Sequence, residues 1–113
     1  MHEFSIALSI IEIAEEEARK VNSDTISELV LDIGTMAGIE FHALDFAMES
    51  ATRNTLLDGA KIVVNKIQAN GRCKDCGHEF EIMTAFDQCP KCKGYFIETL
   101  NGKELKIKSL VAE

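Results

Sequence analysis

The segment Cys73–Cys92, CKDCGHEFEIMTAFDQCPKC, stands apart from the rest of this 113-residue chain. It contains all 4 cysteines, as two C-x2-C pairs separated by twelve residues, and the single proline. Two residues between cysteines let both thiolates reach one cation from a tight turn, and Gly77 and Gly94 relieve the backbone just beyond each pair. The spacing predicts four thiolates around a tetrahedral ion, and zinc is the ion most typical of this ligand set.

Three other interpretations of these cysteines are weaker. Disulfides are disfavoured in a cytosolic chain, where thiols are kept reduced, and redox catalysis needs one exposed CxxC of low pKa instead of two matched pairs. Rubredoxin-like iron suits the same ligands and stays a minor alternative. We therefore expect a closed structural zinc site that supplies folding energy to a segment too small for its own core, with these ligands: Cys73, Cys76, Cys89 and Cys92.

The cysteine segment interrupts a pattern of strands. Residues Ile26–Ile33 alternate between apolar and polar positions, which predicts a strand with one buried face. A second strand is expected over about Lys61–Ala69. The third follows the cysteine segment, where Leu105 and Ile107 alternate with lysines.

Two helices are expected before the cysteine segment. Apolar residues at steps of three and four predict the first helix, which ends near Asn22. Its expected buried stripe consists of Phe4, Ala7, Leu8, Ile11, Ala14, Ala18 and Val21. The second helix fits the apolar spacing of residues 41–51 and closes before the Asp58-Gly59 turn.

These elements predict an α+β (two-layer α/β) fold. Two helices are expected on one face of a three-stranded sheet, with a small four-cysteine zinc-ribbon knob inserted between strands two and three. The expected division is an α/β domain of residues 1–70 and 99–113 and a zinc-binding domain of residues 71–98.

Composition and charge narrow the range of partners. The chain carries a net charge of -7, which disfavours polyphosphate surfaces and anionic membranes. Between Gly71 and Tyr95, four basic and four acidic residues cancel, and four thiolates on Zn²⁺ leave a net negative charge, so nucleic-acid binding is a weak alternative. Glu3 and Glu12 interrupt the first apolar run, and we expect neither a signal peptide nor a membrane span, hence a cytoplasmic protein.

The first three residues, MHE, form a second candidate metal site. The Met1 amine, the His2 amide nitrogen and the His2 imidazole lie in covalent series, so they can close a five-membered and a six-membered chelate ring around one cation. Nitrogen donors at this spacing suit square-planar Ni²⁺ or Cu²⁺, and Glu3, another side chain, water or a partner would supply the fourth position. Because the ring and the amine must lose their protons, acidification should release the metal.

The combination of MHE, a helix, LDIGTMAGIEFHALDFAME and the two CxxC pairs resembles the HypA/HybF family of nickel metallochaperones over essentially the whole chain. The resemblance implies a nickel site at Met1, His2 and Glu3 and structural zinc at the four cysteines. It also implies delivery of Ni²⁺ to [NiFe]-hydrogenase large-subunit precursors together with the GTPase HypB, and in some bacteria a contribution to urease maturation with its accessory proteins. It implies no enzymatic activity and leaves the oligomeric state open.

Glu40 and the two other histidines of the chain are weaker candidates for functional residues. Glu40 is an acidic residue that could approach the nickel end, although its place at the beginning of a helix already has a structural explanation. His42 is expected to be exposed, and His78 to face solvent or lie beside a complete zinc shell. The alternative function is a zinc-ribbon adaptor that binds a protein or RNA partner without nickel, in which case MHE would be incidental.

Overall fold

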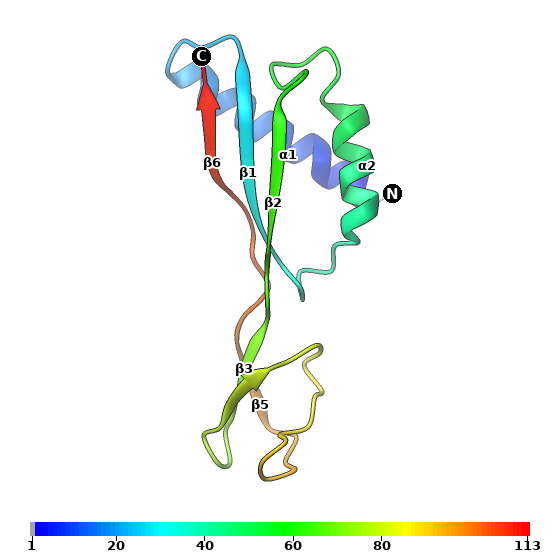
Figure 1. The fold of residues 1–113 in the computed structure, drawn as a ribbon, viewed down its shortest axis with the longest axis vertical. Coiled ribbons are helices and arrows are strands. Elements are labelled where there is room, and N and C mark those ends of the chain that lie inside the picture. The colour runs from blue at the N-terminus through cyan, green and yellow to red at the C-terminus, as the bar shows by residue number, and fades with distance from the viewer. Residues whose placement is uncertain (1) are drawn as a thin grey trace. The chain divides into compact units, whose positions relative to one another are not determined.

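The computed structural model describes residues 2–113 of the chain. The elements are, in order, α1 (His2–Lys20), β1 (Ile26–Gly34), α2 (Phe41–Ala51), β2 (Lys61–Ile67), β3 (Asn70–Cys73), β4 (Glu79–Glu81), β5 (Ile97–Asn101) and β6 (Leu105–Ala112) (Figure 1). None of the helices in this range combines the length and apolar character needed to cross a bilayer.

Strands β1, β2 and β6 form a three-stranded sheet in the order β2-β1-β6. The central strand β1 buries Leu29, Leu31 and Ile33 at alternating positions, as its sequence pattern predicted. The third strand of the sheet follows the cysteine segment in the chain. The predicted α+β fold, with two helices, this sheet and a four-cysteine knob between strands two and three, is confirmed.

Helix α1 buries one stripe along its length, namely Ala7, Ile10, Ile11, Ala14 and Ala18. The prediction missed Ile10 and was wrong for Phe4, Leu8 and Val21, which are 39%, 48% and 67% exposed. Phe4 and Leu8 project toward the edge of the stripe that runs through Ala7 and Ala14, and Val21 lies beyond the last helical residue. Small alanines in the centre of the stripe bring the helix backbone close to its neighbours.

Helix α2 has the bounds that its apolar spacing predicted. Glu40 caps its beginning: the residue has extended backbone angles (φ -87°, ψ 113°), and its carboxylate accepts a hydrogen bond from the Ala43 N–H. Leu44, Ala47 and Met48 form its buried face. The cap therefore fixes the backbone conformation of Glu40, the residue that precedes α2.

A second sheet, in the order β4-β3-β5, was not predicted. Strand β3 pairs antiparallel with both neighbours. At Gly71 a Cβ atom would lie 2.7 Å from a methyl of Ile97 and 3.0 Å from a methyl of Ile82, so glycine is needed for these strands to pack. The strands are only three to five residues long, and their sequences lack the apolar alternation that would reveal them.

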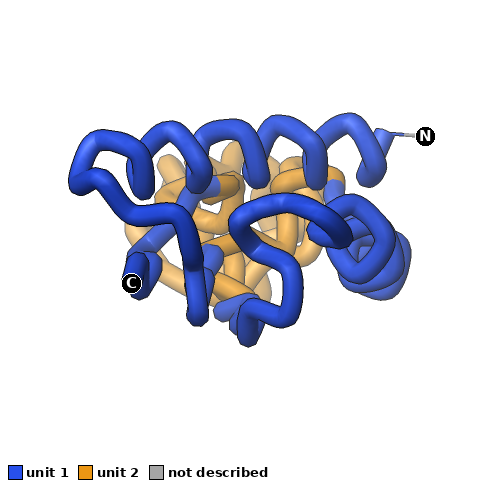
Figure 2. Tube along the Cα trace, turned by 90° about the horizontal axis from the view of Figure 1, so that it is seen from above, with its two compact units in different colours: residues 1–31, 39–65, 106–113 blue, residues 32–38, 66–105 orange. Residues whose placement is uncertain are grey.

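The chain divides into two compact units (Figure 2). The first unit comprises residues 1–31, 39–65 and 106–113, and the second comprises residues 32–38 and 66–105. Within the second unit, residues 34–36 are hydrogen-bonded to Ile67, Gly102 and Glu104. The functional boundary expected from the sequence, with residues 71–98 as the zinc-binding domain, stays a prediction.

Candidate metal centres

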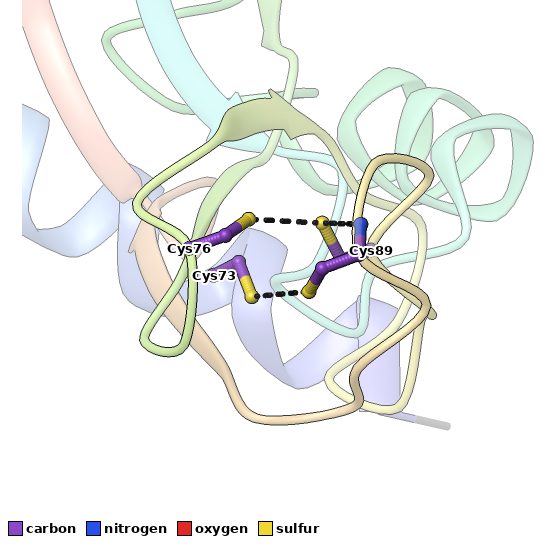
Figure 3. Close-up of side chains that lie close together, drawn as sticks. Cys73, Cys76 and Cys89 are labelled. Atoms are coloured by element: carbon purple, nitrogen blue, oxygen red, sulfur yellow. Dashed lines mark hydrogen bonds between the residues drawn. The ribbon is translucent and has the colours of Figure 1, made fainter.

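Four sulfur atoms converge in the second unit. Cys73 ends β3, Cys76 lies in the turn that leads to β4, and Cys89 and Cys92 lie in another turn before β5. All four Sγ atoms lie within 4.8 Å of one another, with Cys73 and Cys92 3.4 Å apart and Cys76 and Cys89 3.6 Å apart (Figure 3). A tetrahedral ion with bonds of about 2.3 Å holds its sulfurs about 3.8 Å apart. The four free thiols therefore fit such an ion.

Each cysteine pair is followed by a residue with a left-handed backbone, but the type of residue differs between the two turns. In the first turn the Gly77 N–H donates to the Cys73 carbonyl at 2.8 Å, and Gly77 has a φ of 79°, as its glycine predicted. In the second turn the left-handed residue is Lys93, with a φ of 67°, so the prediction that Gly94 relieves the backbone was wrong. A Cβ at Gly94 would instead lie 3.3 Å from the Cys92 sulfur and 2.9 Å from the Asp75 carboxylate. A side chain at residue 94 would therefore require Asp75 and Cys92 to shift.

The protonation of the cysteines also favours a bound cation. Burial raises the pKa of Cys89, but hydrogen bonds from the backbone N–H groups of Cys92 and Lys91, together with the sulfurs of Cys76 and Cys92, lower the pKa to about 7. At Cys92 the Gly94 N–H lowers the pKa, while the sulfur of Cys73 and burial together raise it to about 12. Without a cation, ionisation of one cysteine therefore makes ionisation of a neighbouring cysteine less favourable. A divalent ion removes this conflict by neutralising the thiolates together.

Asp87 supports the loop between the two cysteine pairs, and sequence reasoning missed it. Its carboxylate accepts hydrogen bonds from the Met83 N–H (2.7 Å), the Thr84 N–H (3.2 Å) and the Thr84 hydroxyl (2.8 Å). The Met83 N–H is the main reason why the pKa of Asp87 is lowered. Thr-x-x-Asp was the available signal, but short polar residues make such local hydrogen bonds in many loops.

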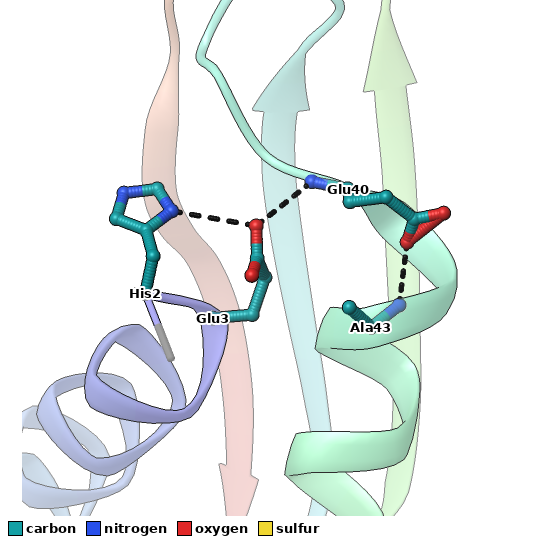
Figure 4. Close-up of polar contacts among 4 residues, drawn as sticks. All are labelled: His2, Glu3, Glu40 and Ala43. Carbon is teal, nitrogen blue, oxygen red and sulfur yellow. Dashed lines mark hydrogen bonds and ion pairs between the residues drawn. The ribbon is translucent and has the colours of Figure 1, made fainter.

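The residues predicted to bind nickel lie at the beginning of α1 in the first unit. Met1 lies outside the described residues. The Nδ1 atom of His2 is 3.3 Å from Oε2 of Glu3, and the same carboxylate oxygen accepts a hydrogen bond from the Glu40 N–H at 3.2 Å (Figure 4). The hydrogen bond from Glu40 is the main cause that lowers the pKa of Glu3, which keeps the carboxylate ionised. The His2 side chain is 63% exposed, so its ring is accessible to an incoming ion.

Glu40 reaches this group through its main chain. Its own carboxylate points to the first turn of α2, where Oε2 is 2.6 Å from the Ala43 nitrogen. The side chain is therefore engaged in capping the helix. The structure brings His2, Glu3 and the Glu40 backbone together and turns the Glu40 carboxylate toward its own helix.

The two remaining histidines lie outside both groups. His42 is exposed in the first turn of α2, as expected. The His78 ring stacks on Phe80 with 5.7 Å between ring centres, and its backbone carbonyl accepts a hydrogen bond from the Cys73 N–H. The four-sulfur group contains neither imidazole.

Comparison with known proteins identifies the family. The sequence model of one protein family, described as "Hydrogenase/urease nickel incorporation, metallochaperone, hypA", matches residues 1–112. The chain belongs to the HypA family. The predicted resemblance is confirmed, and membership makes the chain one of a family of metallochaperones for nickel incorporation in hydrogenase maturation.

Individual HypA relatives extend over nearly the whole chain. The hydrogenase maturation factor HypA of Parabacteroides distasonis is 41% identical over 98% of this chain and 96% of the relative. The corresponding factor of Geotalea uraniireducens is 39% identical over the full length of both. A solution structure of the Ni metallochaperone HypA from Helicobacter pylori is similar with a TM-score of 0.67 and 26% identity, over 97% of this chain and 96% of that one.

Proposed function

We propose that this HypA family member binds Ni²⁺ at Met1, His2 and Glu3 and delivers it during maturation of [NiFe]-hydrogenase. The observation that carries the proposal is the pairing of His2 Nδ1 with the Glu3 carboxylate, 3.3 Å apart at an exposed helix end. Family membership makes nickel the cargo to be expected there.

The identity of the paired ring nitrogen supports a chelate. The Met1 amine and the His2 amide nitrogen close a five-membered ring with a metal, and the His2 amide and Nδ1 close a six-membered ring. Nδ1, the nitrogen that this chelate requires, is also the one that faces Glu3. Two donors about 2.1 Å from one ion and at a right angle are about 3 Å apart. The observed spacing therefore suits Glu3 as the fourth planar donor.

The beginning of α1 lets the backbone nitrogen participate. His2 is the first residue of the helix, and the first four N–H groups of a helix have no partner within it. Replacement of the His2 amide proton by a metal ion therefore breaks no backbone hydrogen bond within the helix. The same residue in the middle of the helix could not supply this ligand without disrupting a turn.

We assign the four cysteines to a structural Zn²⁺. Cys73, Cys76, Cys89 and Cys92 complete a tetrahedral shell with no open position, so the ion would hold the second unit together and take no part in catalysis. This arrangement suits a carrier without enzymatic activity. Accordingly, we assign nickel binding to residues 1–70 and 99–113 and zinc binding to residues 71–98.

The proposed partners follow from the same role. Hydrogenase maturation requires that the chain contacts the maturation machinery, and we propose the GTPase HypB and the hydrogenase large-subunit precursor as these contacts. The family description also names urease, which we include as a second destination of the metal. We place delivery in the cytoplasm, where reduced thiols remain available for zinc.

Titration of the untagged, zinc-loaded chain with Ni²⁺ tests this proposal. We expect tight binding to be lost in His2→Ala and in a chain whose N-terminus is extended by a tag, because both remove a chelating nitrogen. His42→Ala, which changes another exposed histidine near the beginning of a helix, is the matched control and should bind as the unchanged chain does. Zinc content should be equal in all four proteins. Equal nickel affinity in all four would contradict the terminal site and favour the zinc-ribbon adaptor.

A further inference from the structure

The Oε2 atom of Glu3 connects the beginning of α2 with the proposed nickel site. Oε2 of Glu3 contacts both His2 Nδ1, at 3.3 Å, and the N–H of Glu40, at 3.2 Å. Glu3 is only 16% exposed, whereas His2 is 63% exposed. The carboxylate is thus the fixed member of the pair, and the bond from Glu40 helps to hold it.

The Glu40 N–H is itself held in place by the cap of α2. The residue has the extended backbone of an N-cap, and this conformation directs its N–H away from its own helix. The bond of 2.6 Å between the Glu40 carboxylate and the Ala43 N–H stabilises that conformation. Three contacts therefore run in series: the cap fixes the Glu40 backbone, the backbone fixes Glu3, and Glu3 fixes the His2 ring.

We infer that Glu40 is a positioning residue of the nickel site, which acts by capping α2 and presenting its backbone N–H to Glu3. The inference rests on the proposed function, and it assigns the Glu40 side chain to the helix cap instead of to the metal. What residue 40 must supply is an N-cap side chain. A carboxylate at this position is not required.

This role couples α2 to the metal. If nickel fixes the Glu3 carboxylate, the hydrogen bond from Glu40 becomes more persistent, and by reciprocity a stable cap favours nickel binding. Binding should therefore slow hydrogen exchange of the Glu40 amide, which lies outside the metal shell. A side chain that contributed only to general stability would not produce this local, nickel-dependent protection.

Substitutions at residue 40 separate a cap from a ligand. Glu40→Ala removes both the cap and the carboxylate and should weaken His2-dependent nickel binding about two- to thirtyfold, the range that loss of an N-cap can produce. Glu40→Ser removes the carboxylate but restores a preferred capping oxygen, and it should recover most of that affinity. Glu16→Ala, an exposed charge loss on α1, controls for the general loss of negative charge and should leave binding unchanged.

The experiment combines nickel titration of these untagged, zinc-loaded variants with amide exchange measured by NMR with and without nickel. Glu40→Ser as weak as Glu40→Ala would overturn the inference and make the carboxylate itself a ligand. Unchanged affinity in Glu40→Ala, or no nickel-dependent protection of the residue 40 amide, would also overturn it. The proposed function fails separately, when His2→Ala binds nickel as well as the unchanged chain. Thermal melting of each variant without nickel is the control that checks whether the fold is retained.

Discussion

Gly34→Ala should destabilise the second unit through a collision between backbones. A Cβ at residue 34 would lie 1.9 Å from the carbonyl oxygen of Gly102 and 2.7 Å from the Glu104 carboxylate. The same segments are joined by hydrogen bonds from the Gly34 N–H to the Glu104 carbonyl and from the Met36 N–H to the Gly102 carbonyl, both 2.8 Å long. A methyl group has no alternative rotamer, so the backbones must separate.

The expected loss of unfolding free energy comes from the hydrogen bonds and the packing that this separation disrupts. Moving the segments apart by about 1.5 Å removes two hydrogen bonds, each worth a net ~0.5–1.5 kcal/mol. Overpacking of a filled interior adds about 1–3 kcal/mol. The free energy of unfolding should therefore fall by about 2–6 kcal/mol, a large part of the ~5–15 kcal/mol that stabilises a typical domain.

Gly38→Ala is the matched control, because Gly38 belongs to the same segment of the second unit. Gly38 has a φ of 78°, but a Cβ there would meet no atom within 4 Å. Alanine at this position costs only the left-handed backbone strain, about 1–2 kcal/mol. Urea denaturation of the zinc-loaded variants, followed by circular dichroism, measures both losses. The reasoning is refuted if Gly34→Ala costs no more than Gly38→Ala.

Three further predictions concern the core, the surface and the cysteines. Leu44→Ala should cost about 2–5 kcal/mol of unfolding free energy, because Leu44 is 0% exposed, whereas Leu8→Ala at a 48% exposed position should cost far less in the same denaturation assay. Arg72→Ala should change melting little, at most ~1 kcal/mol, because the 2.6 Å ion pair with Glu98 is open to solvent and screened. Cys89→Ser should abolish stoichiometric zinc by metal analysis and accelerate amide exchange within residues 66–105, while the far-UV signal of the helices persists; full zinc content in this variant would contradict the four-sulfur site.

Local sequence signals predicted the elements that depend on neighbours in the chain. The first helix is an example: its apolar spacing predicted an end near Asn22, and α1 ends at Lys20, just before Asn22 adopts a φ of 58° and the Ser23 N–H donates to the Ala18 carbonyl. The alternation in β1 is another, because its buried face repeats with the period of a strand. The identity of the sulfur ligands was equally local, since each pair occupies one turn.

Other features depend on segments that are distant in the chain. The sheet β4-β3-β5 escaped prediction because its short strands are stabilised by pairing with one another and not by a repeated apolar pattern. In the second cysteine turn the left-handed residue is Lys93, whereas Gly94 lies where a Cβ would approach Asp75 and Cys92. Neither requirement is visible in a short window of sequence.

The candidate metal-binding residues were predicted from the amino-acid sequence alone: four cysteines in two CxxC pairs and a histidine with its acidic neighbour at the beginning of a helix. Their donor atoms and spacing are properties of the covalent chain. The surroundings of these residues depend on the folded chain: the backbone of Glu40, 37 residues from Glu3, reaches the Glu3 carboxylate, and the Glu40 side chain caps α2. The physical reason is that a backbone N–H is the same in every residue except proline, so its partner depends on how the chain folds.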